Sequence, residues 1–510
     1  MIMNGGSPLH HAARNGHTRS VALLLTTGAV IEAIDKEKNT PLHLAVWKGN
    51  TGAAELLLDK GASVQAINKY SNTPLHLAAW SGHTGVMELL LKEGALLETH
   101  NRYYNTPLHL ATLKGHTGAV EILLGKGASI SASGENGNTP LHLATRSGYA
   151  GTVELLLMKG ASIEAQNIDT NTPLHLASQC GHSGVVELLL RKGASIGARN
   201  HHSNTPLHLA TCNGHAGVVE LLLRKDVMRL LQASNVFNYT PLHIAASKGH
   251  TGMVELLLGK GASARATGDN SDTPLHLAAQ GGHTAVVELL LGKCASIRAI
   301  GNNRNTPLHL AAQGGHTGVV ELLLRKGASI KVTGRNRNTP LHFAAMGGHT
   351  GVMELFLRKG ALIEAIDMDS KTPLHLAAQG GHIHAVELLL RNSAFIEAIT
   401  GLNMTPLHFA AWYGCTGVVE LLLEKGALIE AKMCNGDTAL HYAARYGYTD
   451  MVELLLGKGA LIEAQTIYNE TPLHLAARRG RTGAVERLLR KGASTEAMEI
   501  CNATPLHPAL

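Results

Sequence analysis

A four-residue string, TPLH, recurs along the whole chain at an almost constant interval. Sixteen copies or close variants occur in equal steps, except that the step from Thr205 to Thr240 is lengthened by a two-residue insertion. The chain has 510 residues, more than the roughly 250 to 300 at which a single core stops growing. One compact globule is therefore excluded, and a linear array of small units is predicted. The copies begin at Ser7, Thr40, Thr73, Thr106, Thr139, Thr172, Thr205, Thr240, Thr273, Thr306, Thr339, Thr372, Thr405, Thr438, Thr471 and Thr504.

Each unit is predicted to form two short helices. In the unit that starts at Thr306, the threonine is placed to cap a first helix, the next residue, proline, suits the first helical position, and His309 can reach back to the cap. Gly314 ends this helix, and a second helix begins near Thr317 and stops at Gly327, where a left-handed residue is expected. Isolated helices of about ten residues are marginal in water. Each unit must therefore pack on its neighbours.

The 33-residue period, with TPLHLAA, a GH pair, a VVELLL-like second helix and a terminal GA, resembles the ankyrin repeat. The resemblance covers essentially the whole chain in fifteen complete units. It implies an all-α solenoid of stacked antiparallel helix pairs with projecting β-hairpin loops. It also implies that partners bind on a concave face and at the hairpin tips. The histidines of the TPLH strings and GH pairs are implied to be structural, with hydrogen bonds to loop backbone between units.

Departures from the period divide the array. Asp226 stands where glycine normally closes the second helix, and because an apolar helical pattern continues after it, that helix is predicted to run on. Cys294 and Ser393 replace the same glycine, and since a left-handed residue other than glycine costs about 1 to 2 kcal/mol, these junctions are expected to be softer. The predicted segments are repeats 1 to 7 in 1–225, an irregular seam with a two-residue insertion in 226–239, repeats 8 to 15 in 240–503, and the truncated start of a sixteenth repeat in 504–510.

Residues able to carry chemistry mostly have structural interpretations here. Of the 31 histidines, sixteen belong to TPLH strings and ten to GH pairs. His201 with His202, or His382 with His384, have no cysteine or second histidine pair at zinc-ligand spacing. GxSxG, HExxH and the phosphate-binding loop are all missing from the sequence. We therefore expect no enzyme activity, no cofactor and no metal site.

Charge and hydropathy argue against two further classes of protein, those that bind nucleic acid and those that insert into membranes. The chain has 44 basic and 38 acidic residues, and many basic residues end second helices, where they complement the helix dipole, so nucleic-acid binding is disfavoured. No apolar run approaches the roughly 18 residues that a membrane-spanning helix needs, which argues against membrane insertion. The opening residues lack the apolar region of a secretory signal, and six scattered cysteines form no CxxC pair. We expect a cytoplasmic protein, with the nucleus left open.

Variable positions over this constant scaffold are where partners would bind, namely the hairpin tips and the two residues after LAA. All three tryptophans occupy the first position after LAA or its variant. Because Trp, Tyr and Arg most often dominate binding energy, two recognition patches are predicted. The N-terminal patch is Trp47, Lys48, Tyr70, Trp80, Tyr103 and Tyr104, beside Leu113 and Lys114; the C-terminal patch is Trp412, Tyr413, Arg445, Tyr446, Arg478 and Arg479, beside Tyr468. The alternative is that these aromatics simply pack on adjacent hairpins. Residues 267–400 contain no Trp or Tyr and are predicted to be a spacer.

The leading hypothesis is a non-enzymatic scaffold or adaptor, a monomer that holds one or more proteins on its concave face and hairpin tips. Both ends look cut within a unit, which favours a second hypothesis: a targeting fragment of a larger multidomain protein, such as a kinase, ubiquitin ligase or channel, whose effector domain is absent. Nucleic-acid binding ranks third. Glutamate replaces the family's usual hairpin asparagine in many units, as at Glu164, Glu364 and Glu430, so asparagine hydroxylation is not carried over.

Overall fold

The computed structural model describes residues 6–224 and 226–498, and these fold as fifteen consecutive helix pairs with one additional helix. No strand occurs in this part of the chain. The first helices are α1 (Pro8–Arg14), α3 (Pro41–Trp47), α5 (Pro74–Ser81), α7 (Pro107–Lys114), α9 (Pro140–Ser147), α11 (Pro173–Cys180), α13 (Pro206–Cys212), α16 (Pro241–Lys248), α18 (Pro274–Gln280), α20 (Pro307–Gln313), α22 (Pro340–Met346), α24 (Pro373–Gln379), α26 (Pro406–Trp412), α28 (Ala439–Tyr446) and α30 (Pro472–Arg478).

The second helices are slightly longer than the first in most units. They are α2 (Thr18–Thr26), α4 (Thr51–Asp59), α6 (Thr84–Lys92), α8 (Thr117–Gly125), α10 (Ala150–Met158), α12 (Ser183–Arg191), α14 (Ala216–Leu222), α17 (Thr251–Gly259), α19 (Thr284–Gly292), α21 (Thr317–Arg325), α23 (Thr350–Arg358), α25 (Ile383–Arg391), α27 (Thr416–Glu424), α29 (Thr449–Gly457) and α31 (Thr482–Arg490). Two short 3-10 turns, η1 (Glu135–Gly137) and η2 (Asn302–Arg304), lie in loops.

The first helix of each unit begins as the sequence predicts. Thr40 caps α3, with its backbone N–H donating to Nδ1 of His43 at 3.1 Å. Nε2 of His43 lies 3.0 Å from the carbonyl oxygen of Asn72 in the next unit, and since a carbonyl only accepts, Nε2 carries the proton. Burial lowers the pKa of His43 to about 4, which keeps the ring neutral. The expected structural role of the TPLH histidines is confirmed, because this link recurs between successive units.

The GH histidines make the complementary connection to the preceding unit. Nε2 of His83 donates to the carbonyl oxygen of Trp47 at 3.2 Å, and the imidazole ring lies against Gly49. Gly49 has a φ of 73°, and a Cβ there would stand 2.7 Å from the ring, so this position requires glycine. Elsewhere Tyr448 takes the histidine's place and donates to the carbonyl of Trp412 at 3.3 Å.

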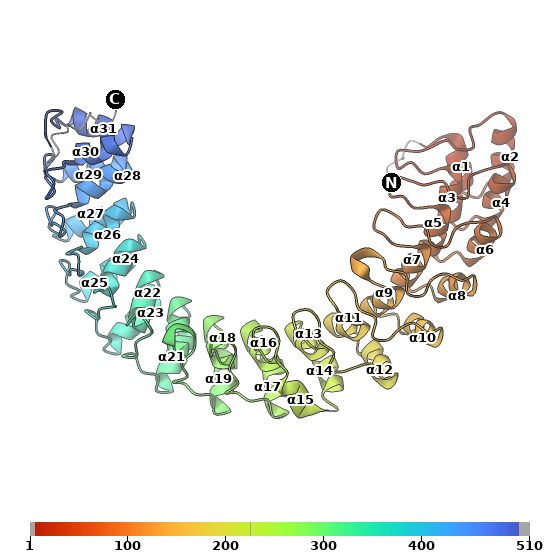
Figure 1. The fold of residues 1–510 in the computed structure, drawn as a ribbon, viewed down its shortest axis with the longest axis horizontal. Helices are drawn as coiled ribbons and strands as arrows, with labels where there is room; N and C mark the ends of the chain where they lie inside the picture. The colour runs from red at the N-terminus through yellow and green to blue at the C-terminus, as the bar shows by residue number, and fades with distance from the viewer. Residues whose placement is uncertain (1–5, 225, 499–510) are drawn as a thin grey trace. The chain divides into compact units, whose positions relative to one another are not determined.

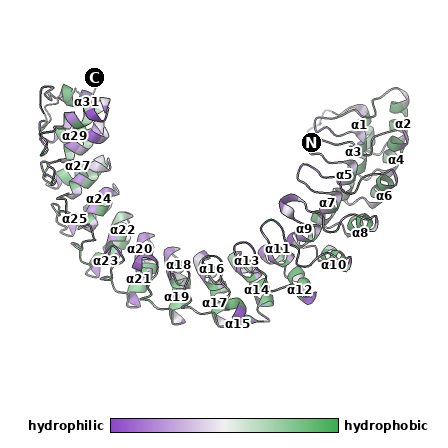
Figure 2. Ribbon diagram, in the orientation of Figure 1, coloured by the Kyte–Doolittle hydropathy of each residue, from purple (hydrophilic) through white to green (hydrophobic). Residues whose placement is uncertain are grey.

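The chain divides into two compact units (Figure 1). We call residues 1–245 with 259–262 the N-terminal unit and residues 246–258 with 263–510 the C-terminal unit. Within each, first helices pack side by side in one row and second helices in another. Figure 2 shows the second helices of the N-terminal unit as predominantly hydrophobic, and side chains such as Leu57 and Leu90 are fully buried between the rows. The core is therefore a continuous thin layer within each unit.

The structure corrects the expectation that the second helix runs on past Asp226. Helix α14 ends at Leu222, and a separate helix, α15 (Val227–Gln232), follows. Asp226 has φ 49° and ψ 37°, a left-handed conformation that ends the turn as glycine would, so the apolar pattern belongs to a new helix. Cys294 and Ser393 are also left-handed, with φ of 64° and 68°, as predicted for the glycine position.

The projecting loops are tight turns. In the loop after α4, the N–H of Asn68 donates to the carbonyl of Asn72 at 3.1 Å, and the N–H of Lys69 donates to the carbonyl of Glu37 in the preceding loop at 2.9 Å. Successive loops are thus joined through backbone, although none of the described residues is in a strand. The predicted truncated repeat at 504–510 lies outside the described residues.

Candidate functional site

Four aromatic side chains of the N-terminal unit line one open groove. Trp47 is the last residue of α3, and Trp80 lies at the equivalent position in α5, one repeat later. Tyr70 and Tyr103 come from the loops after α4 and α6. The groove has a volume of about 650 Å³, and we call it the aromatic groove. Its other lining residues include Leu44, Leu77, Leu110, Leu113, the asparagines of the loops, Glu37 and Glu135.

The rings of the aromatic groove remain accessible. Trp47 is 40% exposed, Trp80 37% and Tyr103 48%, although such large side chains usually bury most of their surface. Two residues of the predicted N-terminal patch do not line the groove. Tyr104 is a left-handed loop residue and is 71% exposed, while Lys48 lies against a ring of the groove. Four of the six residues predicted for the N-terminal patch therefore line the aromatic groove.

Basic side chains cover faces of these rings. Nζ of Lys114 lies 3.8 Å from the centroid of the Trp80 ring, and Nζ of Lys48 lies 4.9 Å from that of Trp47. The Arg14 guanidinium is 5.7 Å from the Trp47 centroid. Such contacts contribute about 0.5 to 1 kcal/mol each at exposed sites, because a ring face is electron-rich.

Asparagines connect the loops that form the wall of the groove, and they are not among the residues predicted from the sequence. Nδ2 of Asn68 donates to Oδ1 of Asn39 at 2.9 Å, and Nδ2 of Asn101 donates to Oδ1 of Asn72 at 2.9 Å. The pattern continues through 167 and 138, 200 and 171, and 235 and 204. We call this the asparagine ladder. Its signal in the sequence is an Asn directly before TPLH with a second Asn in the loop of the following unit, as with Asn39 and Asn68.

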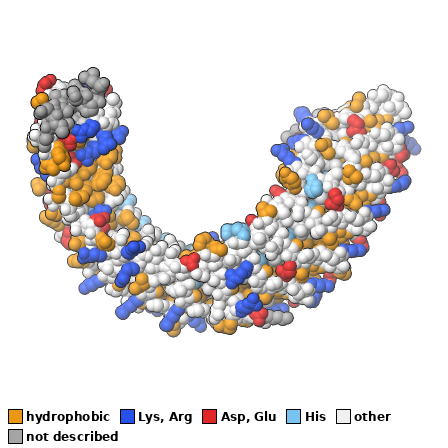
Figure 3. All heavy atoms as spheres, in the orientation of Figure 1, with side chains coloured by type: hydrophobic (Ala, Val, Ile, Leu, Met, Phe, Trp, Pro, Cys, Tyr) orange, Lys and Arg blue, Asp and Glu red, His pale blue; other side chains and the backbone are white. Residues whose placement is uncertain are grey.

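Trp412, in the predicted C-terminal patch, packs on aromatic side chains of its own repeat and of the next repeat. Its ring lies 5.6 Å from that of Tyr442 at an interplanar angle of 19°, 5.7 Å from Tyr413 and 6.5 Å from Phe409. Tyr442 stacks in turn on Tyr446 at 6.4 Å. Figure 3 shows the resulting hydrophobic surface over α26 and α28, beside Lys and Arg side chains towards the C-terminal end. Trp412 thus packs on aromatic residues of α26 and α28 and not on an adjacent hairpin, while Tyr413 stays 49% exposed.

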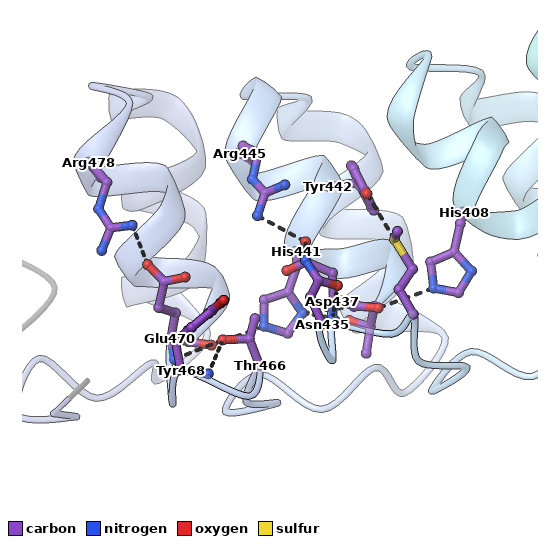
Figure 4. Close-up of polar contacts among 12 residues, drawn as sticks. His408, Asn435, Asp437, His441, Tyr442, Arg445, Thr466, Tyr468, Glu470 and Arg478 are labelled. Atoms are coloured by element: carbon purple, nitrogen blue, oxygen red, sulfur yellow. Dashed lines mark hydrogen bonds and ion pairs between the residues drawn. The ribbon is translucent and has the colours of Figure 1, made fainter. Parts of the chain in front are cut away.

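Two of the three arginines predicted in this patch pair with carboxylates of the chain. Nη2 of Arg445 lies 2.9 Å from Oδ2 of Asp437, and Arg478 forms an ion pair with Glu470 (Figure 4). Asp437 is fully buried and also accepts from Nδ2 of Asn435 at 2.8 Å, but its Oδ1 atom has no partner among the described residues. The basic character of this patch is thus partly neutralised.

Burial in this cluster shifts the pKa values of two neighbouring side chains. Burial first, and then the Asp437 carboxylate, raises the pKa of Tyr442 to about 12. Loss of solvation lowers the pKa of His441 to about 4, although the same carboxylate acts in the opposite direction. Neither side chain gains or loses a proton near neutral pH, which favours a structural role for both.

The segment predicted as a spacer contains a hollow of its own. A cavity of about 340 Å³ is lined in part by Phe343, Met346, Lys371 and Gln379. Oε1 of Gln379 and Oδ1 of Asn338 are buried there without a donor from the described residues. This segment is therefore less featureless than its composition indicates.

Four exposed apolar side chains form a further surface that the sequence analysis missed. Leu362, Phe395, Leu428 and Leu461 follow the last helical turn in four successive units and are 60–67% exposed. Most units have serine at this position. Val30 and Leu96 are also apolar there, so the signal of this surface is four apolar residues in successive units. The backbone N–H of Phe395 donates at 2.8 Å to the carboxylate of Glu364, which explains the glutamate found in place of the usual asparagine.

The family comparison agrees with this architecture. The model of the family "Ankyrin repeats (3 copies)" matches in overlapping segments from residue 2 to residue 499. Among solved structures, the crystal structure of the human ASB11 ankyrin repeat domain is similar, with 30% identity and a TM-score of 0.40, over 42% of this chain and 98% of that one. None of the curated proteins matches. In the described residues, no group of three His, Cys, Asp or Glu could hold a metal ion, and no helix is both long and apolar enough to cross a membrane. The chain belongs to the ankyrin repeat family.

Proposed function

We propose that this protein is a non-enzymatic scaffold that binds partner proteins in its aromatic groove. The observation that carries the proposal is that Trp47, Tyr70, Trp80 and Tyr103 line one groove of about 650 Å³. Tryptophan and tyrosine in an accessible apolar pocket are the residues that most often dominate interface energy. A family that generally binds proteins, and a site without convergent nucleophiles or bases, both support this reading over catalysis.

The C-terminal patch is proposed as a second, weaker surface. Tyr413, Tyr446 and Tyr468 are 49%, 36% and 55% exposed, and Arg479 is also exposed. The Trp412 ring contacts that of Tyr413, with centroids 5.7 Å apart. The two surfaces would hold two partners or two parts of one large partner. Monomeric action in the cytoplasm is part of the same proposal.

The experiment compares proteins captured from native lysate by the intact chain and by a Trp47→Ala/Trp80→Ala variant. We expect selective loss of a subset of proteins, followed by at least a tenfold rise in Kd when one of them is purified and titrated. A Leu23→Ala/Met158→Ala variant is the matched control, because both residues are 66% exposed and lie outside the groove. Equal losses with both variants, or none with either, would refute the proposal.

A further inference from the structure

We propose that the occupant of the aromatic groove is an acidic segment of a partner protein, rich in carboxylates and apolar side chains. This inference rests on the proposed function and adds the chemical class of the partner. It follows from the charges and hydrogen-bond donors around the groove, which are unlike those of the C-terminal patch.

Cations at the tryptophans are not neutralised by the chain itself. Lys48 and Arg14 lie over Trp47, and Lys114 lies over Trp80. None of these three basic side chains forms an ion pair with any described residue, in contrast to Arg445 and Arg478 of the C-terminal patch. They therefore keep their positive potential for an incoming anion.

The groove has fewer acidic residues than basic residues around it. Glu37 is paired with Lys69, so their charges cancel, and Glu135 is the one lining carboxylate without an ion pair among the described residues. The loop tip beside Glu37 adds two exposed basic residues, Lys36 and Lys38. Asp35 of the same loop is buried, and its carboxylate accepts from the backbone N–H groups of Glu37 and Asn39. Basic residues therefore outnumber acidic ones around the groove, and they would steer and hold a negatively charged segment.

Two amide groups add neutral donors to the same wall. Oδ1 of Asn72 accepts from Asn101, and Oδ1 of Asn105 accepts from the backbone N–H of Glu135 at 3.3 Å. The Nδ2 groups of Asn72 and Asn105 donate to no described residue, and both asparagines line the groove. Asn72 and Asn105 occupy the same position in successive repeats, so these donors stand one repeat apart. They would donate to carboxylates or carbonyl oxygens of an extended chain.

Observations at the rings favour a protein over a nucleic acid. A base binds such a surface by stacking on a ring face, but basic side chains of the protein itself occupy faces of both tryptophans. The lining includes Leu44, Leu77, Leu110 and Leu113, which suit aliphatic or aromatic side chains. An acidic, apolar peptide segment satisfies both features.

A random dodecapeptide library displayed on phage tests the inference on the full chain. We expect peptides that bind the intact protein to be enriched in Asp, Glu and apolar residues. A Lys48→Glu/Lys114→Glu variant should bind the enriched peptides about tenfold more weakly, with a flatter dependence on salt. The matched control is Lys126→Glu/Lys159→Glu, which makes the same charge change at exposed helix ends away from the groove and should leave Kd within twofold.

Enrichment of basic or neutral peptides, no enrichment, or equal weakening by the control would overturn the inference. A labelled U12 RNA that binds as tightly as the enriched peptides and competes with them would also overturn it, in favour of nucleic acid. The proposed function is judged separately. If Trp47→Ala/Trp80→Ala loses captured proteins while the peptides show no acidic preference, the scaffold remains and only the partner chemistry is wrong.

Discussion

Asparagine amides join successive loops of the N-terminal unit, whereas the corresponding positions in the C-terminal unit have diverged. Asp367 stands where the N-terminal unit has Asn68 and Asn101, and Thr400, Met433 and Thr466 follow in later repeats. The C-terminal unit instead uses aromatic stacking and arginine–carboxylate pairs. Both units keep the histidine links between repeats, so the scaffold stays constant while the side chains around it change.

The difference separates two kinds of aromatic surface. In the N-terminal unit the tryptophans lie over a groove and keep 37–40% of their surface exposed. In the C-terminal unit Trp412 packs on Tyr442, because this tyrosine, one repeat along, stands where most repeats have leucine. An aromatic after LAA therefore does not by itself make a binding site, since its neighbours decide whether the ring is free.

Acidification should have the largest effect, and it should destabilise both units. His76 in the N-terminal unit and His375 in the C-terminal unit both have a pKa lowered to about 4 by burial. In the unfolded chain histidine titrates near 6.5, so the unfolded state binds more protons between pH 6.5 and 4. Stability is therefore complete above pH 6.5 and falls as the pH drops through this window, by about 3 kcal/mol for each such histidine.

Denaturant unfolding followed by tryptophan fluorescence can test this in each unit. A Trp412→Phe variant reports on the N-terminal unit, and a Trp47→Phe/Trp80→Phe variant reports on the C-terminal unit. Both midpoints should fall between pH 7 and pH 5 and stay constant between pH 7 and pH 8. A midpoint that does not change at pH 5 in either unit would contradict the assigned role of the histidines.

The tryptophans should differ in their contribution to stability. We expect Trp412→Ala to lower the free energy of unfolding of its unit by about 2 kcal/mol, because the ring packs on Tyr442 and Phe409. Trp47→Ala should lower the free energy of unfolding of its unit by about 1 kcal/mol or less, since the ring is 40% exposed. Hydrogen exchange in α26 and α28, compared with α3 and α5, measures the two effects. Equal losses would remove the distinction between a groove and a packed cluster.

A swap between Asn and Asp tests the asparagine ladder in both directions. Asn101→Asp removes the donor to Asn72 and faces two oxygens towards each other, so it should destabilise the loops by about 1 to 2 kcal/mol. Asp367→Asn should have the opposite effect of about 1 kcal/mol, because it supplies the missing donor to Oδ1 of Asn338. The variant Asn15→Asp, at an exposed position, is the control for the added negative charge. Thermal unfolding in which both substitutions destabilise would show that the two units do not differ in this way.

Local patterns in the sequence predicted the capped helices and the positions of the tryptophans. Thr40 and His43 lie within one helical turn, so their contact follows from helix geometry, and the period fixes Trp47 and Trp80 one repeat apart. The rest depends on contacts between repeats. The stacking of Trp412 and the new helix after Asp226 were missed because distant side chains and a left-handed residue decide them.

Left-handed positions at the ends of the second helices should give the smallest effect. Gly127 of the N-terminal unit is typical of this position. Cys294 and Ser393 of the C-terminal unit, like Asp226 of the N-terminal unit, are left-handed there without being glycine. Replacing Cys294 or Ser393 with glycine should stabilise its unit by about 1 kcal/mol, because the Cβ strain is removed. Gly127→Ala should cost a similar amount, and since no atom lies within 4 Å of the added Cβ, the cost would be purely conformational. Ser393→Ala keeps the Cβ and is the control; if it stabilises as much as Ser393→Gly in thermal unfolding, backbone strain is not the cause.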